Sequence, residues 1–194
     1  MTTASDILDG LKYPLKVWGH KDICSRSNPV PTKSGAYACY FRSVPSQVPV
    51  QDCVRFDNLT LLYIGISPAQ QQSKSHLRNR IRTHYTRNAS ASTLRFTLGC
   101  LLADDLDIQL RRTGRTQRLT FTDGEQKLSE WMSRNMYVVW RTCDRPWSLE
   151  VDLINSVSLP LNLNHNQNHK FHPQLSEVRR IARQTAKALP IVTR

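Results

Sequence analysis

Three short stretches of the chain combine apolar, β-branched and aromatic residues and are bounded by turn-forming residues. They cover residues 35–42, 59–67 and 136–143. Runs of this length and composition are typical of β-strands, and the last is apolar enough to indicate a buried strand. We therefore expect these three segments to carry the core of the fold.

Segments with apolar residues three or four positions apart predict helices around these strands. In residues 76–85, Leu77, Ile81 and Tyr85 form such a stripe. The spacing in residues 122–125 is that of a capping box and predicts the start of another helix. Further helices are expected at residues 5–11, 94–110, 147–157 and 173–189.

The first two strands each carry a tyrosine and a glycine. Because side chains alternate across a strand, Tyr37 and Phe41 are expected on one face of the first strand. In the second strand, Leu61 and Tyr63 are expected to share a face, with Gly65 next in the same row. A glycine inside a strand often marks close approach of backbone or ligand. Pairing of the strands would bring both phenols together, although a strand tyrosine more often serves packing alone.

Charge narrows the choice of partner. The chain has 194 residues, and its 27 Lys and Arg against 15 Asp and Glu give a net charge of +12. Such an excess favours a polyanionic partner, since every phosphate contact releases counterions. A membrane surface is less favoured because no basic helix has a broad aromatic and aliphatic face. No apolar run is long enough to span a bilayer.

The cysteines and the N-terminus predict a cytoplasmic protein. The five cysteines are odd in number, widely scattered and without a C-x-x-C pair. This pattern favours reduced thiols over disulfides or a cysteine-rich zinc site. The first residues lack the basic start and apolar core of a signal peptide.

Arginines gather in three places. Arg80 and His84 lie four residues apart on one border of the apolar stripe in 76–85, with further arginines on the other border. A second group surrounds Gly114 at the tip of a predicted hairpin, and a third lies on a mostly polar face of the last helix. The candidates for nucleic-acid contacts are Arg78, Arg82, Arg111, Arg112, Arg115, Arg118, Arg179, Arg180 and Arg183.

Glu150 has an unusual position in the predicted helix 147–157. The apolar period of that helix places it in the middle of the apolar face. A carboxylate buried there is costly unless it is neutralised or bound to a cation. Alternatively, Glu150 lies in the first turn and interacts with the helix dipole from a partly exposed site. The pattern alone leaves both interpretations open.

Taken together, five short fragments resemble the GIY-YIG nuclease family. They occur in the order of the family's motifs and extend over about residues 35–162. The fragments are Gly35-Ala36-Tyr37, Tyr63-Ile64-Gly65, the helix at 77–84, Leu149-Glu150 through Leu153-Ile154, and Pro160-Leu161-Asn162.

The chain departs from the family pattern in several places. Ala36 replaces the usual Ile or Val of the first triplet, and Ile66 stands where a lysine often follows the second. The loop at 43–58 and the segment at 67–76 are enlarged. A long segment between Arg80 and Glu150 holds the basic hairpin and two additional helices.

The resemblance implies an α/β (α+β) fold, with a small central antiparallel three-stranded sheet flanked by helices and a helical insertion. We expect a single domain over residues 1–194. Its core covers about 34–165, the insertion about 94–135 and a C-terminal basic helix about 173–189.

The resemblance also implies hydrolysis of phosphodiester bonds with one divalent cation, Mg²⁺ or Mn²⁺. Glu150 would be the metal ligand, and Arg80 would hold the phosphate and offset its developing charge. Tyr37 or Tyr63 would be the general base. His84 would orient a tyrosine, relay a proton or serve structure alone. Asn162 would position the glutamate helix through hydrogen bonds of its side chain, with Asn164 as a near alternative.

These expectations add up to an endonuclease that acts on DNA. A catalytically silent nucleic-acid-binding domain and a nuclease that acts on RNA are the alternatives. The protein is expected to work as a monomer or as a homodimer, since cutting both strands requires two active sites or two successive nicks.

Overall fold

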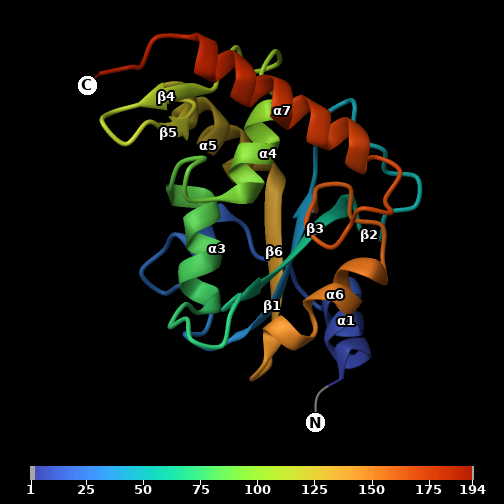
Figure 1. The fold of residues 1–194 in the computed structure, drawn as a ribbon. Coiled ribbons are helices and arrows are strands. Elements are labelled where there is room, and N and C mark those ends of the chain that lie inside the picture. Colours follow the sequence, from blue (N-terminus) through green and yellow to red (C-terminus); the bar gives the residue numbers. More distant parts are fainter. Residues whose placement is uncertain (1–2, 194) are drawn as a thin grey trace.

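A four-stranded antiparallel sheet, in the order β2-β3-β1-β6, forms the centre of the computed structural model (Figure 1). The structure describes residues 3–193. Its three long strands confirm the predicted ones, and the fold is the expected small antiparallel sheet flanked by helices. The short edge strand β2 lies in the segment that was predicted to be a loop. The strands are β1 (Gly35–Phe41), β2 (Arg55–Phe56), β3 (Leu59–Ser67) and β6 (Met136–Thr142).

Helices cover both faces of the sheet and divide the core into two layers. One layer packs under α1 and α6, and the other under the remaining helices (Figure 1). The first pair is α1 (Ala4–Lys12) and α6 (Glu150–Asn155), the latter preceded by a 3-10 turn, η1 (Pro146–Ser148). The others are α2 (His20–Ile23), α3 (Leu77–Thr86), α4 (Thr93–Leu101), α5 (Gly124–Asn135) and α7 (His172–Ala188).

A bulge in β3 changes which side chains share a face. Cys39 pairs with Tyr63, but the next residue, Tyr40, pairs with Leu61, so Leu62 is the extra residue. An inserted residue reverses the alternation of side chains on either side of it. The prediction that Leu61 and Tyr63 share a face is therefore wrong. Leu61 packs in the layer under α1 and α6, whereas Tyr63 faces the other layer with Tyr37.

Two predicted helices are shorter than expected. The helix at 94–110 ends at Leu101, and the following acidic segment turns back through Asp107, whose φ is 48°. The helix at 147–157 contributes only η1 and α6, which end at Asn155. Short polar side chains such as Asp compete for backbone hydrogen bonds and favour turns over helix interiors.

The capping box at 122–125 does not form. Thr122 has a φ of 52°, which is outside the extended conformation of a normal N-cap. Glu125 instead accepts hydrogen bonds from the backbone N–H groups of Ala89 and Phe121. The carboxylate therefore connects α5 to the segment that follows α3 and to the residue two positions before the N-cap of α5.

The basic segment is the predicted hairpin. Strands β4 (Arg111–Thr113) and β5 (Arg118–Thr120) pair antiparallel around a tip that contains Gly114, with a φ of 63°. That conformation favours glycine because it lacks a side chain.

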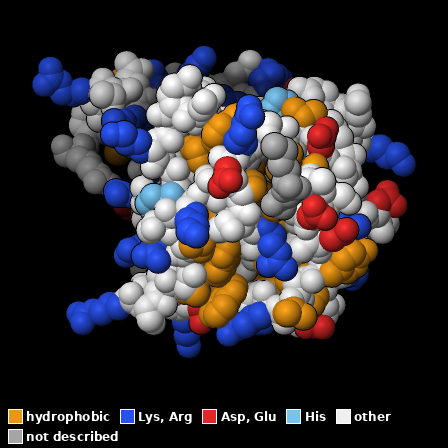
Figure 2. All heavy atoms as spheres, turned by 90° about the horizontal axis from the view of Figure 1, so that it is seen from below, with side chains coloured by type: hydrophobic (Ala, Val, Ile, Leu, Met, Phe, Trp, Pro, Cys, Tyr) orange, Lys and Arg blue, Asp and Glu red, His pale blue; other side chains and the backbone are white. Residues whose placement is uncertain are grey.

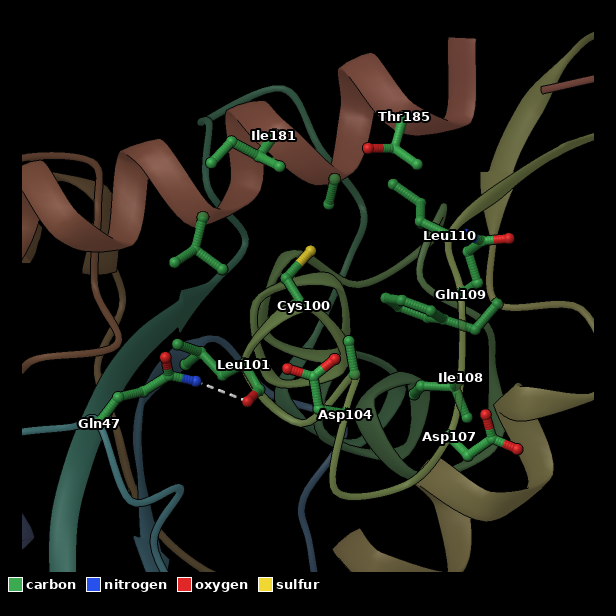
Figure 3. Close-up of a pocket in the computed structure, with 14 residues that line it drawn as sticks. Gln47, Cys100, Leu101, Asp104, Asp107, Ile108, Gln109, Leu110, Ile181 and Thr185 are labelled. Atoms are coloured by element: carbon green, nitrogen blue, oxygen red, sulfur yellow. Dashed lines mark hydrogen bonds between the residues drawn. The ribbon is translucent and has the colours of Figure 1, made fainter. Parts of the chain in front are cut away.

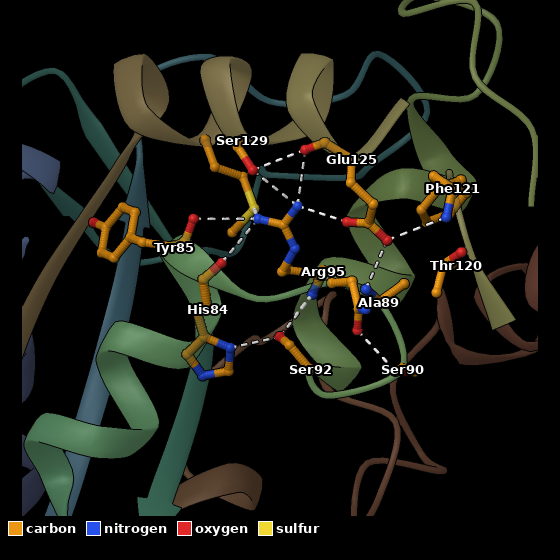
Figure 4. A network of polar contacts seen from close by, with 12 residues as sticks. His84, Tyr85, Ala89, Ser90, Ser92, Arg95, Thr120, Phe121, Glu125 and Ser129 are labelled. Atoms are coloured by element: carbon orange, nitrogen blue, oxygen red, sulfur yellow. Dashed lines mark hydrogen bonds and ion pairs between the residues drawn. The ribbon is translucent and has the colours of Figure 1, made fainter. Parts of the chain in front are cut away.

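A buried arginine fastens the insertion to α3 (Figure 4). Arg95 of α4 is fully buried and donates to the carbonyl oxygens of His84 and Tyr85. It also forms an ion pair with Glu125 at 2.7 Å and donates to Ser129 Oγ at 3.0 Å. The cation thus satisfies carbonyl groups near the C-terminal end of α3, where positive charge is stabilising.

Figure 2 shows the face of the molecule at the lower end of Figure 1. The basic side chains on this face do not form a single continuous patch. There, Lys and Arg side chains are interspersed with acidic side chains and apolar areas. The five cysteines are free thiols; Cys39 is fully buried and Cys143 partly exposed. Within residues 3–193, no helix is long and apolar enough to cross a membrane.

Removal of Arg95 should destabilise the whole fold. We expect Arg95→Met and Glu125→Gln each to lower the free energy of unfolding by about 3–5 kcal/mol, because each leaves a buried partner unpaired. Urea denaturation measures the change. The double variant should lose less than the sum of the two single losses. Additive losses would contradict a coupled pair.

Candidate active site

The paired strands bring the two predicted tyrosines together. Tyr37 of β1 lies opposite Gly65 of β3, and the centroids of the Tyr37 and Tyr63 rings are 6.3 Å apart. A Cβ atom on Gly65 would lie 2.6 Å from Cζ of Tyr37. The glycine therefore leaves the space that the first phenol occupies, as the strand pattern indicated.

His84 connects this pair to helix α3. It is fully buried, and its Nε2 lies 2.7 Å from Oη of Tyr37. Its Nδ1 lies 2.7 Å from Oγ of Ser92, the N-cap of α4. Burial, together with the charges of Arg80 and Arg95, holds the pKa of His84 well below its ordinary value. The imidazole is therefore neutral near pH 7.

Arg80 is a cation that interacts with both phenols. It lies one turn before His84 on α3, and the two tyrosines raise the pKa of its guanidinium. Burial raises the pKa of both Tyr37 and Tyr63, most strongly for Tyr37, while Arg80 lowers both. Arg80 therefore favours ionisation of a phenol at this position.

Glu150 combines features of both interpretations of the sequence. It is the first residue of α6 and partly exposed, as expected for a residue in the first turn. Burial nevertheless raises the pKa of its carboxyl group, against the opposing charges of His165 and Arg80. Its Oε2 lies 4.0 Å from Nε2 of His165, a residue with an exposed side chain.

Asn162 lies next to the second triplet. Its side chain is buried and accepts a hydrogen bond from the N–H of Ile64 at 3.0 Å and donates one to the carbonyl oxygen of the same residue at 2.8 Å. It therefore bonds to β3 as a neighbouring strand would. This contact holds the chain that follows α6 against the residue after Tyr63.

These side chains line a cavity of about 380 Å³. The cavity thus brings together the phenols of β1 and β3, the guanidinium of Arg80 on α3, the carboxylate of α6 and the amide of the turn after α6. His84 stays behind this surface, in contact with Tyr37. The predicted residues that line the cavity are Tyr37, Tyr63, Arg80, Glu150, Asn162 and, unexpectedly, Arg179.

A larger cavity of about 800 Å³ lies elsewhere, between α7 and the segment that follows α4 (Figure 3). Cys100, Leu110 and Ile181 face it, and Gln47 donates to the carbonyl oxygen of Leu101 at its border. No side chain with a predicted catalytic role lines this cavity. The candidate active site is therefore the smaller one.

Apart from Arg179, which is buried and lines the cavity, the arginines predicted for nucleic-acid contacts divide into two groups. Arg78, Arg111 and Arg112 donate to backbone carbonyl groups of Val30, Pro190 and of Ala186 and Leu189, respectively. These three side chains therefore make structural contacts with the backbone of other segments. The exposed members of the set are Arg82, Arg115, Arg118, Arg180 and Arg183.

Sequence reasoning missed Ser92 and Arg95, which lie behind the cavity at the start of α4 and contact His84. It named Arg179 as a nucleic-acid contact but expected it on a polar outer face, whereas the side chain is buried and lines the cavity. The serine had a detectable signal, because its place before an apolar run is that of an N-cap. Its contact with a histidine on another helix depends on tertiary packing.

Comparison with known protein families decides the identity of the fold. A family model described as the GIY-YIG catalytic domain matches residues 35–181, well over half of the chain. The chain belongs to the GIY-YIG family. The resemblance noted in the sequence is thereby confirmed, and membership of this GIY-YIG family implies nuclease activity. Comparisons with curated proteins and with solved structures gave no match.

Replacement of the family's second glycine should disturb the first tyrosine. We expect Gly65→Ala to destabilise the protein by about 1–3 kcal/mol, because the added methyl group overlaps the Tyr37 ring. Urea denaturation measures the loss. Since the phenol oxygen is the nearest atom, Tyr37→Phe in the same chain should recover part of it. Unchanged stability of Gly65→Ala would contradict the close approach.

Burial of neutral His84 should make the protein sensitive to acid. Its folded-state pKa is lowered, so the unfolded chain binds a proton first as the pH falls below about 6.5. His84 therefore costs no stability above that pH and up to about 1.4 kcal/mol per pH unit below it. Denaturation between pH 7 and pH 5 measures the slope. In His84→Gln the slope should be shallower, and identical slopes would exclude this origin.

Proposed function

We propose that the protein is a metal-dependent endonuclease that hydrolyses phosphodiester bonds in DNA. The observation that carries the proposal is the common cavity, which Tyr37, Tyr63, Arg80 and Glu150 line together. These side chains supply the groups that the reaction needs: a proton acceptor, a cation for the phosphate and a hard oxygen ligand. The net charge of +12 supports a polyanionic substrate.

Glu150 fits a single Mg²⁺ or Mn²⁺ ion. Its carboxylate lines the cavity, is partly desolvated and has no Lys or Arg within 4.0 Å among the described residues. Residues 3–193 contain no cluster of three or more His, Cys, Asp or Glu side chains that could hold a metal. Water and substrate oxygens would therefore complete the coordination, as Mg²⁺ prefers. When bound, the cation polarises the phosphate and stabilises the leaving oxygen.

Arg80 binds the scissile phosphate in this proposal. Its planar fork of N–H donors matches two phosphate oxygens, and its position beside the phenols places it within the cavity. Its NH1 donates to the carbonyl oxygen of Ala91 at 3.5 Å, and this contact helps to position the guanidinium before the substrate arrives, so that less reorganisation is needed to stabilise developing negative charge.

In this proposal Tyr37 first loses its phenolic proton to solvent through the cavity and then, as the phenolate, takes the proton of the attacking water. A hydrogen bond to His84 distinguishes it from Tyr63. Arg80 and Arg95 oppose a positive charge on His84, so the imidazole is a poor final acceptor for that proton. We infer that it donates from Nε2 to the phenolate oxygen and, with Arg80, stabilises the ionised form of Tyr37. Tyr63 then contacts the water or the phosphate from the other side of the cavity.

The donor role of His84 agrees with its second contact. Ser92 Oγ already accepts the backbone N–H of Arg95. Its own hydroxyl proton is best used by donation to Nδ1 of His84, because a buried hydroxyl without an acceptor is unfavourable. An unprotonated Nδ1 leaves the proton of the neutral imidazole on Nε2, facing Tyr37.

Exposed arginines would hold the DNA outside the cavity. Arg82 lies on the same helix as Arg80, Arg115 and Arg118 lie at the hairpin, and Arg180 and Arg183 lie on α7. Contacts of this kind add affinity without sequence information. The five free thiols fit a reducing compartment, and we keep the prediction of a cytoplasmic protein that works as a monomer or homodimer.

Plasmid cleavage tests the proposal. We expect nicking of supercoiled DNA with Mg²⁺ or Mn²⁺ and none with a chelator. Glu150→Gln and Tyr37→Phe should remove most of the activity, and Arg80→Gln should lower the rate by about 10²–10³-fold. Tyr63→Phe should retain more activity than Tyr37→Phe. The exposed Arg134→Gln on α5 is the matched control and should cleave like the wild type.

The same assay separates the alternatives. Cleavage by Glu150→Gln at the wild-type rate would refute the assigned metal ligand. Salt-sensitive DNA binding without cleavage by any of the proteins would indicate a silent binding domain. Single-stranded DNA and RNA of the same sequence, tested beside the plasmid, identify the substrate class.

A further inference from the structure

Arg179 is a second arginine of the catalytic cavity. It belongs to α7, far from Arg80 in the sequence, and lines the same cavity of about 380 Å³. Only 7% of its surface is exposed, whereas the neighbouring Arg180 is an exposed side chain. Helix α7 therefore turns one arginine inward and the next outward.

The insertion holds this side chain in place. Arg179 NH1 donates to Oγ1 of Thr97 on α4 at 2.7 Å. The guanidinium carbon lies 4.8 Å from the centroid of the Phe96 ring, and that of Arg183 lies 4.5 Å from the same centroid. A hydrogen bond and a cation–π contact thus fix the direction of the guanidinium.

No anion of the chain balances this charge. Among residues 3–193, no carboxylate lies within 4.0 Å of Arg179, whereas Arg95, which is fully buried, pairs with Glu125 at 2.7 Å. Burial and the charge of Arg183 lower the pKa of Arg179 to about 10. A buried cation without an anion is unfavourable in the free protein and would be stabilised by an anionic ligand.

We propose that Arg179 binds a phosphate group of the nucleic-acid substrate inside the catalytic cavity, in addition to the contact made by Arg80. This inference rests on the proposed function and extends it to a second phosphate ligand, built by α4 and α7. Cavities of roughly 300–1,000 Å³ accommodate small organic ligands, so the present one has room for about one nucleotide. The fork of Arg matches phosphate oxygens in pairs.

Binding and cleavage by full-length variants test this role. We expect Arg179→Gln to bind a labelled DNA duplex, measured by fluorescence anisotropy with chelator present, about tenfold to hundredfold more weakly than the wild type. Single-turnover cleavage at subsaturating protein should fall by a similar factor. Without DNA, Arg179→Gln should melt at the wild-type temperature or above it, because it removes an unbalanced buried charge.

Two variants complete the experiment. Arg134→Gln removes the same charge from the exposed surface of α5, where no contact with DNA is proposed, and should bind like the wild type. Arg179→Lys keeps the charge without the fork and should bind with intermediate affinity. The duplex should also raise the melting temperature of the wild type more than that of Arg179→Gln.

The outcomes are distinct. Equal binding by Arg179→Gln and Arg134→Gln would overturn the proposal. So would a lower melting temperature of Arg179→Gln together with equal binding by the Gln and Lys variants, since Arg179 would then be structural. If Arg80→Gln and Glu150→Gln lose cleavage while Arg179→Gln does not, the proposed function stands and this inference fails. Binding that depends on Arg179 in a protein without cleavage would support the inference and refute the nuclease.

Discussion

The hydrogen bond between Tyr37 and His84 is the contact on which the site depends. It joins the central strand β1 to helix α3 at full burial, where each polar atom needs a partner. On one side, the phenol fits only because Gly65 has no side chain. On the other side, the imidazole is held by Ser92 at the start of α4. Sheet, helix and insertion therefore determine the position of one hydroxyl group together.

The electrostatics of the site favour neutral side chains in the free protein. Burial raises the pKa of both phenols and of Glu150 and lowers that of His84. Arg80 opposes this trend for the tyrosines and the carboxylate but adds to it for the histidine. A bound cation beside Glu150 and a phosphate beside Arg80 would change the field at each of these groups. In the proposed reaction, the substrate complex thus creates the charges that the free site disfavours.

The sequence predicted the strands and the motif residues because both depend on local information. Apolar runs located β1, β3 and β6, and the order of five fragments located Tyr37, Tyr63, Arg80 and Glu150. The bulge at Leu62 was not predictable, since the number of residues between two strand partners is set by pairing rather than composition. The inward direction of Arg179 was missed for a similar reason. Helix periodicity places it on a polar face, and only the packing of α7 on α4 shows what covers that face.

The insertion does more than lengthen the chain. Extra residues in a surface loop cost little entropy, so their presence alone requires no function. Here, however, the start of α4 contacts the site: Ser92 contacts His84, Arg95 contacts the end of α3, and Thr97 contacts Arg179. Helix α4 therefore supports both His84 and Arg179. Arg95 is balanced by Glu125 within the insertion, whereas Arg179 has no such partner among the described residues. One buried arginine thus stabilises the fold, and the other leaves its charge for a ligand. Arg95 and Glu125 are therefore the structural part of the insertion, whereas Thr97, which holds Arg179, belongs to the site.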